Sequence, residues 1–149
     1  GEERLAAYHR IMDEAGRPAT IIDFPIDTRS SARQAVVDYT QAHGHPDGVL
    51  CQNDDIAMGA FRALRDLGLR VPDDVAIVGF DGNEDKEYLD TPLTTVALPV
   101  AEMCRLSWEV LRGRLTREAG SPSPSPYRTM LRPTLIVRES TGGAPVPSG

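Results

Sequence analysis

Hydrogen-bonding side chains follow two short apolar runs in the middle of the chain, and their types suit the binding of a polar ligand. Asn53 and Asp54 come shortly after the run GVLC, and Asp81 closes the run VAIVGF. Amide and carboxylate groups can bind the hydroxyl or N–H groups of a small molecule. Together with Asp55, the two aspartates can also hold Mg²⁺ for phosphoryl transfer, because that ion takes oxygen ligands.

The elements that position these residues can be predicted from apolar spacing. Apolar residues three and four apart predict helices, and unbroken apolar runs predict buried strands. The predicted helices cover residues 2–15, 30–43, 53–67 and 100–113, and the predicted strands cover 20–24, 48–51, 75–80, 94–98 and 131–137. Because helices alternate with strands, we expect an α/β fold with an open doubly wound parallel sheet. In such sheets the ligand crevice lies outside the carboxyl ends of the strands.

Composition narrows the possible functions. The 149 residues carry a net charge of −6 with no block of Lys or Arg, which argues against a surface that binds nucleic acid. Cys51 and Cys104 are far apart and belong to no metal or redox motif, so we expect no metal site and a reduced, cytoplasmic setting. No apolar run is long enough to cross a membrane. The chain opens within a predicted helix, which suggests a fragment.

Helix capping is the competing role for the acidic residues. Asp54 stands where an N-cap residue accepts backbone N–H bonds, and capping is the preferred interpretation there. For Asp81, capping and ligand binding remain equally open. An enzyme finds less support, because His9, His43 and His45 lie away from the strand ends and no Gly-rich phosphate loop is present. We therefore predict no catalytic residue.

Residues 51–96 resemble the signature region of the LacI/GalR family of bacterial transcription regulators. The resemblance rests on the Asn-Asp pair, Gly59, "LGLRVPDDV", "VGFD" and "PLTTV" in that order. It continues upstream through "ERLAAYHRIMDEAG" and downstream through "LRPTLIVREST". It implies the later part of a type I periplasmic-binding-protein-like effector core. Operator DNA would be bound only by an N-terminal helix-turn-helix module that has no counterpart in this chain.

The resemblance also implies functional residues. The positions that match effector-contacting residues are Arg4, Phe24, Asn53 and Asp81, with Gln52 and Asp54 as neighbouring candidates. The effector would be sugar-like or purine-like, would need no cofactor, and would act by favouring a closed cleft. A homodimer is expected, with these interface candidates: Met58, Arg62, Tyr88 and Leu89.

The expected organisation has five parts. They are a C-terminal effector-binding subdomain (1–98), a crossover helix that belongs to the other subdomain (99–115), a flexible Ser/Pro loop (116–127), a returning strand segment (128–139) and a disordered tail (140–149). The apolar stripe of the crossover helix would lack a partner, so we expect it to fold back on the sheet, to exchange with another copy or to pack in an oligomer. An exported sugar-binding receptor of the same fold is the remaining alternative.

Overall fold

The computed structural model describes residues 2–83, 89–116 and 128–143. Their elements are α1 (Glu2–Glu14), α2 (Arg29–His43), β1 (Gly48–Leu50), α3 (Asp54–Asp66), β2 (Ala76–Asp81), β3 (Thr94–Ala97), α4 (Val100–Leu115), β4 (Thr134–Ile136) and the short 3-10 helix η2 (Glu139–Thr141). Residues 117–127 of the predicted Ser/Pro loop, residues 144–149 of the predicted tail and the dimer candidate Tyr88 lie outside the described residues.

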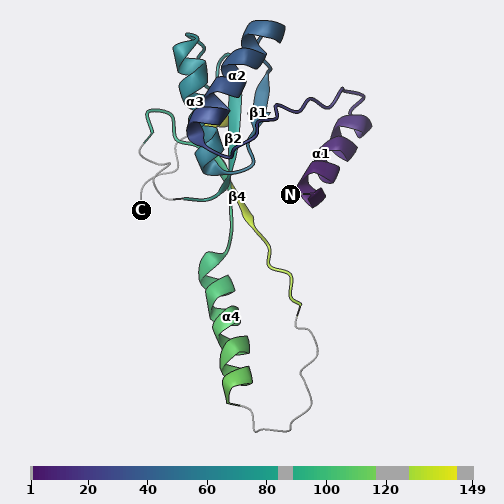
Figure 1. The fold of residues 1–149 in the computed structure, drawn as a ribbon, viewed down its shortest axis with the longest axis vertical. Helices are drawn as coiled ribbons and strands as arrows, with labels where there is room; N and C mark the ends of the chain where they lie inside the picture. Colours follow the sequence, from purple (N-terminus) through teal and green to yellow (C-terminus); the bar gives the residue numbers. More distant parts are fainter. Residues whose placement is uncertain (1, 84–88, 117–127, 144–149) are drawn as a thin grey trace.

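The strands form one sheet in the order β1-β2-β3-β4. The first three strands are parallel, which confirms the predicted fold class, but β4 pairs antiparallel with β3. Figure 1 shows the reason: the chain leaves the sheet beyond β3 through α4 and returns to the same end, so β4 must run in the opposite direction. The sequence predicted a last strand at residues 131–137 but did not indicate its direction.

The segment 20–24 is extended but is not a strand, which corrects the prediction. Its backbone groups bond to side chains instead of to a neighbouring strand. The N–H of Thr20 donates to Tyr8 Oη at 3.1 Å, and Tyr8 Oη donates to the Thr20 carbonyl at 3.3 Å. The N–H of Phe24 donates to Oδ1 of Asp23 at 2.9 Å.

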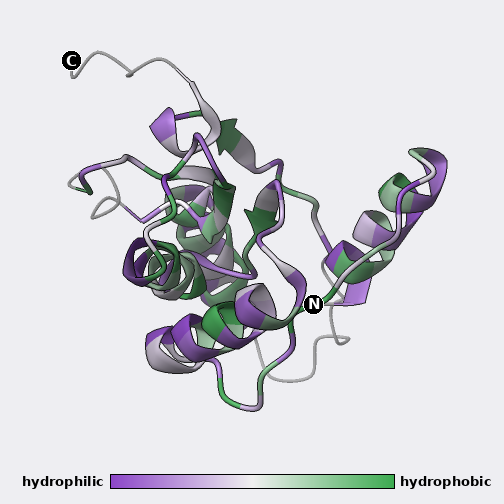
Figure 2. Cartoon of the chain, turned by 90° about the horizontal axis from the view of Figure 1, so that it is seen from above, coloured by the Kyte–Doolittle hydropathy of each residue, from purple (hydrophilic) through white to green (hydrophobic). Residues whose placement is uncertain are grey.

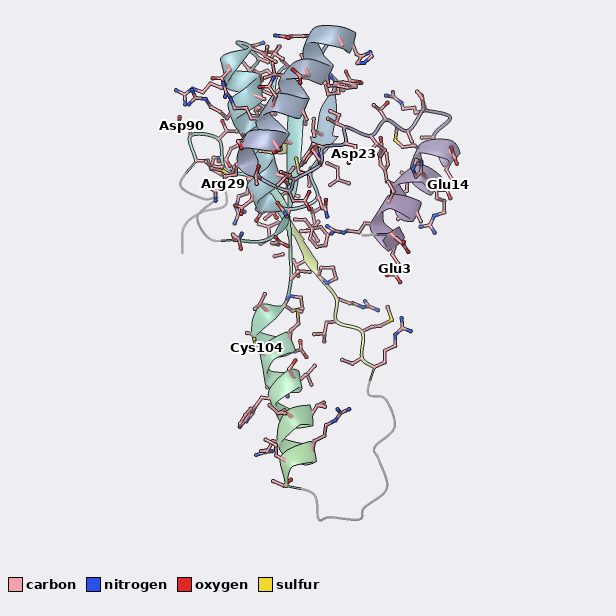
Figure 3. The ribbon with its side chains drawn as sticks, in the orientation of Figure 1. Glu3, Glu14, Asp23, Arg29, Asp90 and Cys104 are labelled. Carbon is pink, nitrogen blue, oxygen red and sulfur yellow. The ribbon has the colours of Figure 1, made fainter. Side chains whose placement is uncertain are left out.

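The core lies between the strands and the helices α2 and α3, which pack against each other (Figure 1). Its buried hydrophobic residues are Ala32, Val36, Cys51, Ile56, Ala57, Ala60, Ala63, Leu64, Val75, Ile77 and Leu93. Figure 2 shows hydrophobic residues gathered in the strands at the centre of the molecule. Helix α1 stands on the other side of β1 and buries none of its residues; Figure 3 labels Glu3 and Glu14 toward its two ends.

The helix termini are fixed by capping residues, and two of them differ from the prediction. Helix α2 begins at Arg29 because Thr28, and not the expected Ser30 or Ser31, is the N-cap; its side chain accepts from the N–H of Ser31. Asn53 caps α3, so the preferred assignment of Asp54 as a cap was wrong. Gly68, directly after the C-cap residue of α3, has φ of +73°, the left-handed conformation that often ends a helix.

Helix α4 extends away from the sheet beside the chain that returns to β4 (Figure 1), and Figure 3 labels Cys104 on it. It buries none of its residues, and Trp108 and Leu115 are 59% and 71% exposed. It therefore does not fold back on the sheet, which was one of the expected outcomes. None of the helices among the described residues is long and apolar enough to span a bilayer.

The C-terminal segment that follows β4 is tied to the sheet, so the expectation of a disordered tail was wrong for residues 140–143. Ser140 is fully buried, and its Oγ donates to the Ile77 carbonyl at 2.6 Å. The same Oγ accepts from the N–H of Thr94 at 2.8 Å. These bonds join the end of the described chain to β2 and β3.

Candidate binding site

The first predicted site residue, Asn53, lies at the junction between β1 and α3. Its Oδ1 accepts from the N–H of Ile56 at 2.8 Å, which satisfies one of the free N–H groups of the first helical turn. Its Nδ2 amide group then remains as the part of the side chain that can donate to a ligand. The capping bond fixes the side chain in place, so Asn53 presents a preorganised donor.

Arg4 reaches this junction from α1. Its Nη1 donates to the carbonyl oxygen of Gln52 at 2.7 Å. Its guanidinium carbon lies 4.2 Å from the centre of the Phe80 ring, a cation–π contact worth about 0.5–1 kcal/mol at an exposed position. One side chain thus contacts the segment after β1 and the end of β2.

Asp81 ends β2, beside the same junction. Partial burial raises the pKa of its carboxyl group, the charges of Asp54 and Asp55 raise it further, and the Arg4 guanidinium opposes the rise. The Arg4 guanidinium lies over the ring of Phe80, the residue directly before Asp81, so it stands at the same end of β2. Arg4, Asn53 and Asp81 therefore lie at the same end of the sheet, and their role in binding an effector stays a prediction.

Phe24 is not joined to these three residues by any contact found among the described residues. It packs against the hydrophobic core. It also lines a shallow groove between the segment 21–25 and α2, and none of Arg4, Asn53 and Asp81 lines that groove. The aromatic side chain that does contact the cluster is Phe80, which the sequence analysis did not select. A signal for it existed, because Phe80 directly precedes Asp81.

Asp54 has a role that the sequence analysis missed. It is fully buried, and its carboxylate accepts hydrogen bonds from Thr95 and from the backbone beyond β2. The available signal was Gly79, because a glycine within an apolar strand often marks the close approach of another group. A Cβ at Gly79 would lie 2.2 Å from Asp54 Oδ1.

The interface candidates lie partly within the domain itself. Met58 is half-buried on α3, and Leu89 packs against the core. The Arg62 guanidinium pairs with Asp66 at 2.8 Å and remains mostly exposed. Met58 and Leu89 are both only partly buried, so together with Arg62 they stay the interface candidates among the described residues.

The chemistry of the site is that of hydrogen bonding. Within residues 2–83, 89–116 and 128–143, no group of three or more His, Cys, Asp or Glu side chains is arranged to hold a metal ion. Asp54 cannot offer a free carboxylate, because its oxygens already accept bonds from the protein. The cluster instead offers a guanidinium, an amide and one carboxylate, a set that suits a ligand with several hydroxyl or ring N–H groups.

Comparison with known proteins identifies relatives over nearly the whole chain. The periplasmic binding protein-like domain model matches residues 1–141. The ribose operon repressor of Haemophilus influenzae is 35% identical over 143 residues, which cover 93% of this chain and 41% of that protein. The chain thus spans about two fifths of that repressor's length.

Solved structures give the same result. A LacI-family regulator of Sanguibacter keddieii superposes with a TM-score of 0.87 at 35% identity, over 94% of this chain and 53% of that one. A LacI-family regulator of an Arthrobacter species, crystallised with lactose, gives 0.78 at 36% identity over 89% and 48%. The fold is that of a periplasmic-binding-protein-like α/β domain. The chain belongs to the periplasmic binding protein-like family, in the branch formed by the LacI-family transcriptional regulators.

Proposed function

We propose that this chain is the C-terminal part of the effector-binding core of a LacI-type transcriptional regulator. It binds a small effector, sugar-like or purine-like, without chemical turnover. The effector favours a closed cleft, and closure changes the affinity of a separate helix-turn-helix module for operator DNA. The regulator acts in the cytoplasm.

The observation that carries the proposal is the meeting of Arg4, Asn53 and Asp81 at the carboxyl ends of β1 and β2. These residues are distant in sequence, and parallel strands place ligands at this end of the sheet. A charge-assisted hydrogen bond from Asp81 to the effector would contribute about 1.5–3 kcal/mol. The lactose-bound Arthrobacter regulator supports a sugar as the first class to test.

The exposed helix α4 fits the same proposal. Its apolar side chains, including Trp108 and Leu115, face outward beside the returning chain. We propose that α4 belongs to the other subdomain of the core and is covered there. The face of α3 that carries Met58 and Arg62 is proposed to contribute to a homodimer.

The first experiment reads the gene upstream of this chain. A helix-turn-helix segment there supports the regulator, whereas a secretion signal supports the exported receptor and contradicts the proposal. The protein encoded by the complete reading frame is then screened by thermal shift against lactose, ribose, sucrose, cellobiose and purine bases. A ligand at 100 times its Kd stabilises a protein by about 2.7 kcal/mol.

The site is tested with a matched pair of variants. Asp81→Ala removes the proposed ligand carboxylate, and Asp90→Ala removes a carboxylate whose side chain is 95% exposed. We expect Asp81→Ala to weaken binding of the selected compound about tenfold or more, because a charge-assisted bond is lost, and Asp90→Ala to leave binding unchanged. Equal binding by both variants would exclude this site.

A further inference from the structure

Asp54 is a buried acidic residue whose role goes beyond starting a helix. It is the first residue of α3 and is completely buried. Burial of a carboxylate is unfavourable unless hydrogen bonds replace its water. The cap of α3 is supplied by Asn53, so the Asp54 side chain is available for other contacts.

The two oxygens of Asp54 bind different parts of the fold. Oδ1 accepts from the hydroxyl of Thr95 on β3 at 2.7 Å. Oδ2 accepts from the N–H of Gly82 at 3.1 Å and from the N–H of Asn83 at 2.9 Å. Hydrogen bonds to an ionised group are about twice as strong as neutral ones. Asp54 therefore connects α3 and β3 to the segment that leaves β2.

The segment held in this way begins with a strained residue. Asp81 has φ of +121°, a backbone conformation that residues other than glycine rarely adopt, and Gly82 follows at +80°. Such a conformation persists where the surrounding structure fixes it, and it concentrates at ligand sites. The two N–H groups bound by Asp54 belong to the two residues directly after Asp81.

Two glycines make room for this arrangement. A Cβ at Gly79 would lie 2.2 Å from Asp54 Oδ1, so a larger residue there would displace the carboxylate. A Cβ at Gly82 would lie 2.5 Å from Cβ of Ala97 on β3. The first contact leaves room for the Asp54 carboxylate, the second lets the segment after β2 lie against β3, and each depends on the absence of a side chain.

We propose that Asp54 is a positioning residue of the effector site: its buried carboxylate fixes the segment after β2 and so sets the direction of the Asp81 side chain. Asp54 does not contact the effector itself. The assignment of Asp81 to the effector rests on the proposed function, but the hold of Asp54 on the segment does not.

The test uses the full chain and three variants. Asp54→Ala removes every bond to the segment, and Asp54→Asn keeps a neutral oxygen that can partly replace Oδ2. Thr95→Val is the matched control, because it removes only the bond that Oδ1 accepts and leaves both N–H bonds that Oδ2 accepts. Amide hydrogen exchange of Gly82 and Asn83 is measured by NMR in each variant.

We expect exchange at Gly82 and Asn83 to accelerate about tenfold or more in Asp54→Ala, relative to the amides of α3, because charge-assisted bonds are lost. Asp54→Asn should be intermediate, and Thr95→Val should leave these two amides as protected as the rest of the core. Equal acceleration across all amides in the Asp54 variants and in Thr95→Val would show a purely structural role and would overturn the proposal.

Titration of Asp81 supplies a second measurement, which reports how close the Asp54 charge lies to the Asp81 carboxyl group. The charged groups acting on Asp81 are Asp54 and Asp55 on α3 and Arg4 on α1. Following the Asp81 carboxyl carbon by NMR, we expect its pKa to fall in both Asp54 variants and to stay raised in Thr95→Val. An unchanged pKa in Asp54→Asn would contradict the proximity on which the proposal depends.

Folding of the variants does not limit the test. If neither Asp54 variant folds, the wild type decides: Gly82 and Asn83 protected as strongly as the α3 core support the proposal, and rapid exchange at both amides overturns it. No effector is used in these measurements. A chain that shows the expected exchange but binds none of the screened compounds would contradict the proposed function and leave the role of Asp54 intact.

Discussion

Gly59 lies at a close contact between α3 and α2, and replacing it tests the packing that holds α3 in place. A Cβ built at Gly59 would lie 2.3 Å from the carbonyl oxygen of Arg29 and 2.9 Å from Cβ of Ala32. Both neighbours belong to the first turn of α2. The oxygen is part of the backbone, so it can move away only if the whole helix moves.

Two opposing terms set the size of the effect of Gly59→Ala. Alanine is favoured over glycine within a helix by about 1 kcal/mol. Overpacking usually costs about 1–3 kcal/mol, and relief of this contact requires a shift of about 1 Å, because carbon–oxygen contacts usually lie near 3.3 Å. We expect the upper end of that range and a net loss of about 1–2 kcal/mol, which lowers the Tm by about 2–8 °C.

The assay is thermal unfolding followed by circular dichroism, with Gly113→Ala as the control. A Cβ at Gly113 on α4 would have no heavy atom within 4 Å. Because α4 buries none of its residues, the helix preference of alanine should appear as a small rise in helical signal without a lower Tm. If Gly59→Ala is as stable as the wild type, α2 and α3 do not pack as closely as described here.

Three further predictions follow from single residues. The pKa of Asp81 is higher in the folded chain than in the unfolded chain, where it is about 3.9. Its contribution to the free energy of unfolding is therefore fully present below the pKa of the unfolded chain and is lost as pH rises through the pKa of the folded chain. Asp81→Asn should therefore gain stability relative to the wild type over that window, and urea titrations at several pH values would measure the gain. Burial raises the pKa of Cys51 to about 12, whereas Cys104 is exposed, so a thiol reagent should label Cys104 in the folded chain and Cys51 only after unfolding. Ser140→Ala should cost about 1–3 kcal/mol in the free energy of unfolding, because it leaves the buried N–H of Thr94 without its acceptor.

The sequence predicted the helices and central strands well, because their signals are local. The apolar spacing of α3 and the glycine that follows it fixed both ends of that helix to within a residue. The segment 20–24 failed for the opposite reason. Its composition favours a strand, but a strand needs a partner, and Tyr8 occupies backbone groups at Thr20 instead. The direction of β4 also depended on the return path of the chain, which has no local signal.

Only part of the site could be predicted, namely the part that follows from the order of the strands. Asn53 and Asp81 could be paired in advance, because β1 and β2 are adjacent parallel strands and their carboxyl ends share one edge. Arg4 followed only from the family resemblance, since nothing in the spacing of α1 indicates which strand end it approaches. The bonds of Asp54 have only an indirect signal in the sequence, Gly79, because they join α3 to β3 and to the segment after β2 across the fold.

The parts of the site differ in how firmly they are held, and this difference bears on mechanism. Asn53 is fixed by a capping bond, and Asp81 follows β2 into a segment bound by a buried carboxylate. Arg4 comes from a helix that buries no residue, and it is attached by one hydrogen bond and one ring contact. On the proposed function, an effector would therefore meet two preorganised groups and draw in the third. Arg4 belongs to α1, so a hydrogen bond between its guanidinium and the effector would favour a shift of that helix against the sheet. A ligand changes a conformational equilibrium only through contacts that differ between the two states, and this contact would be one of them.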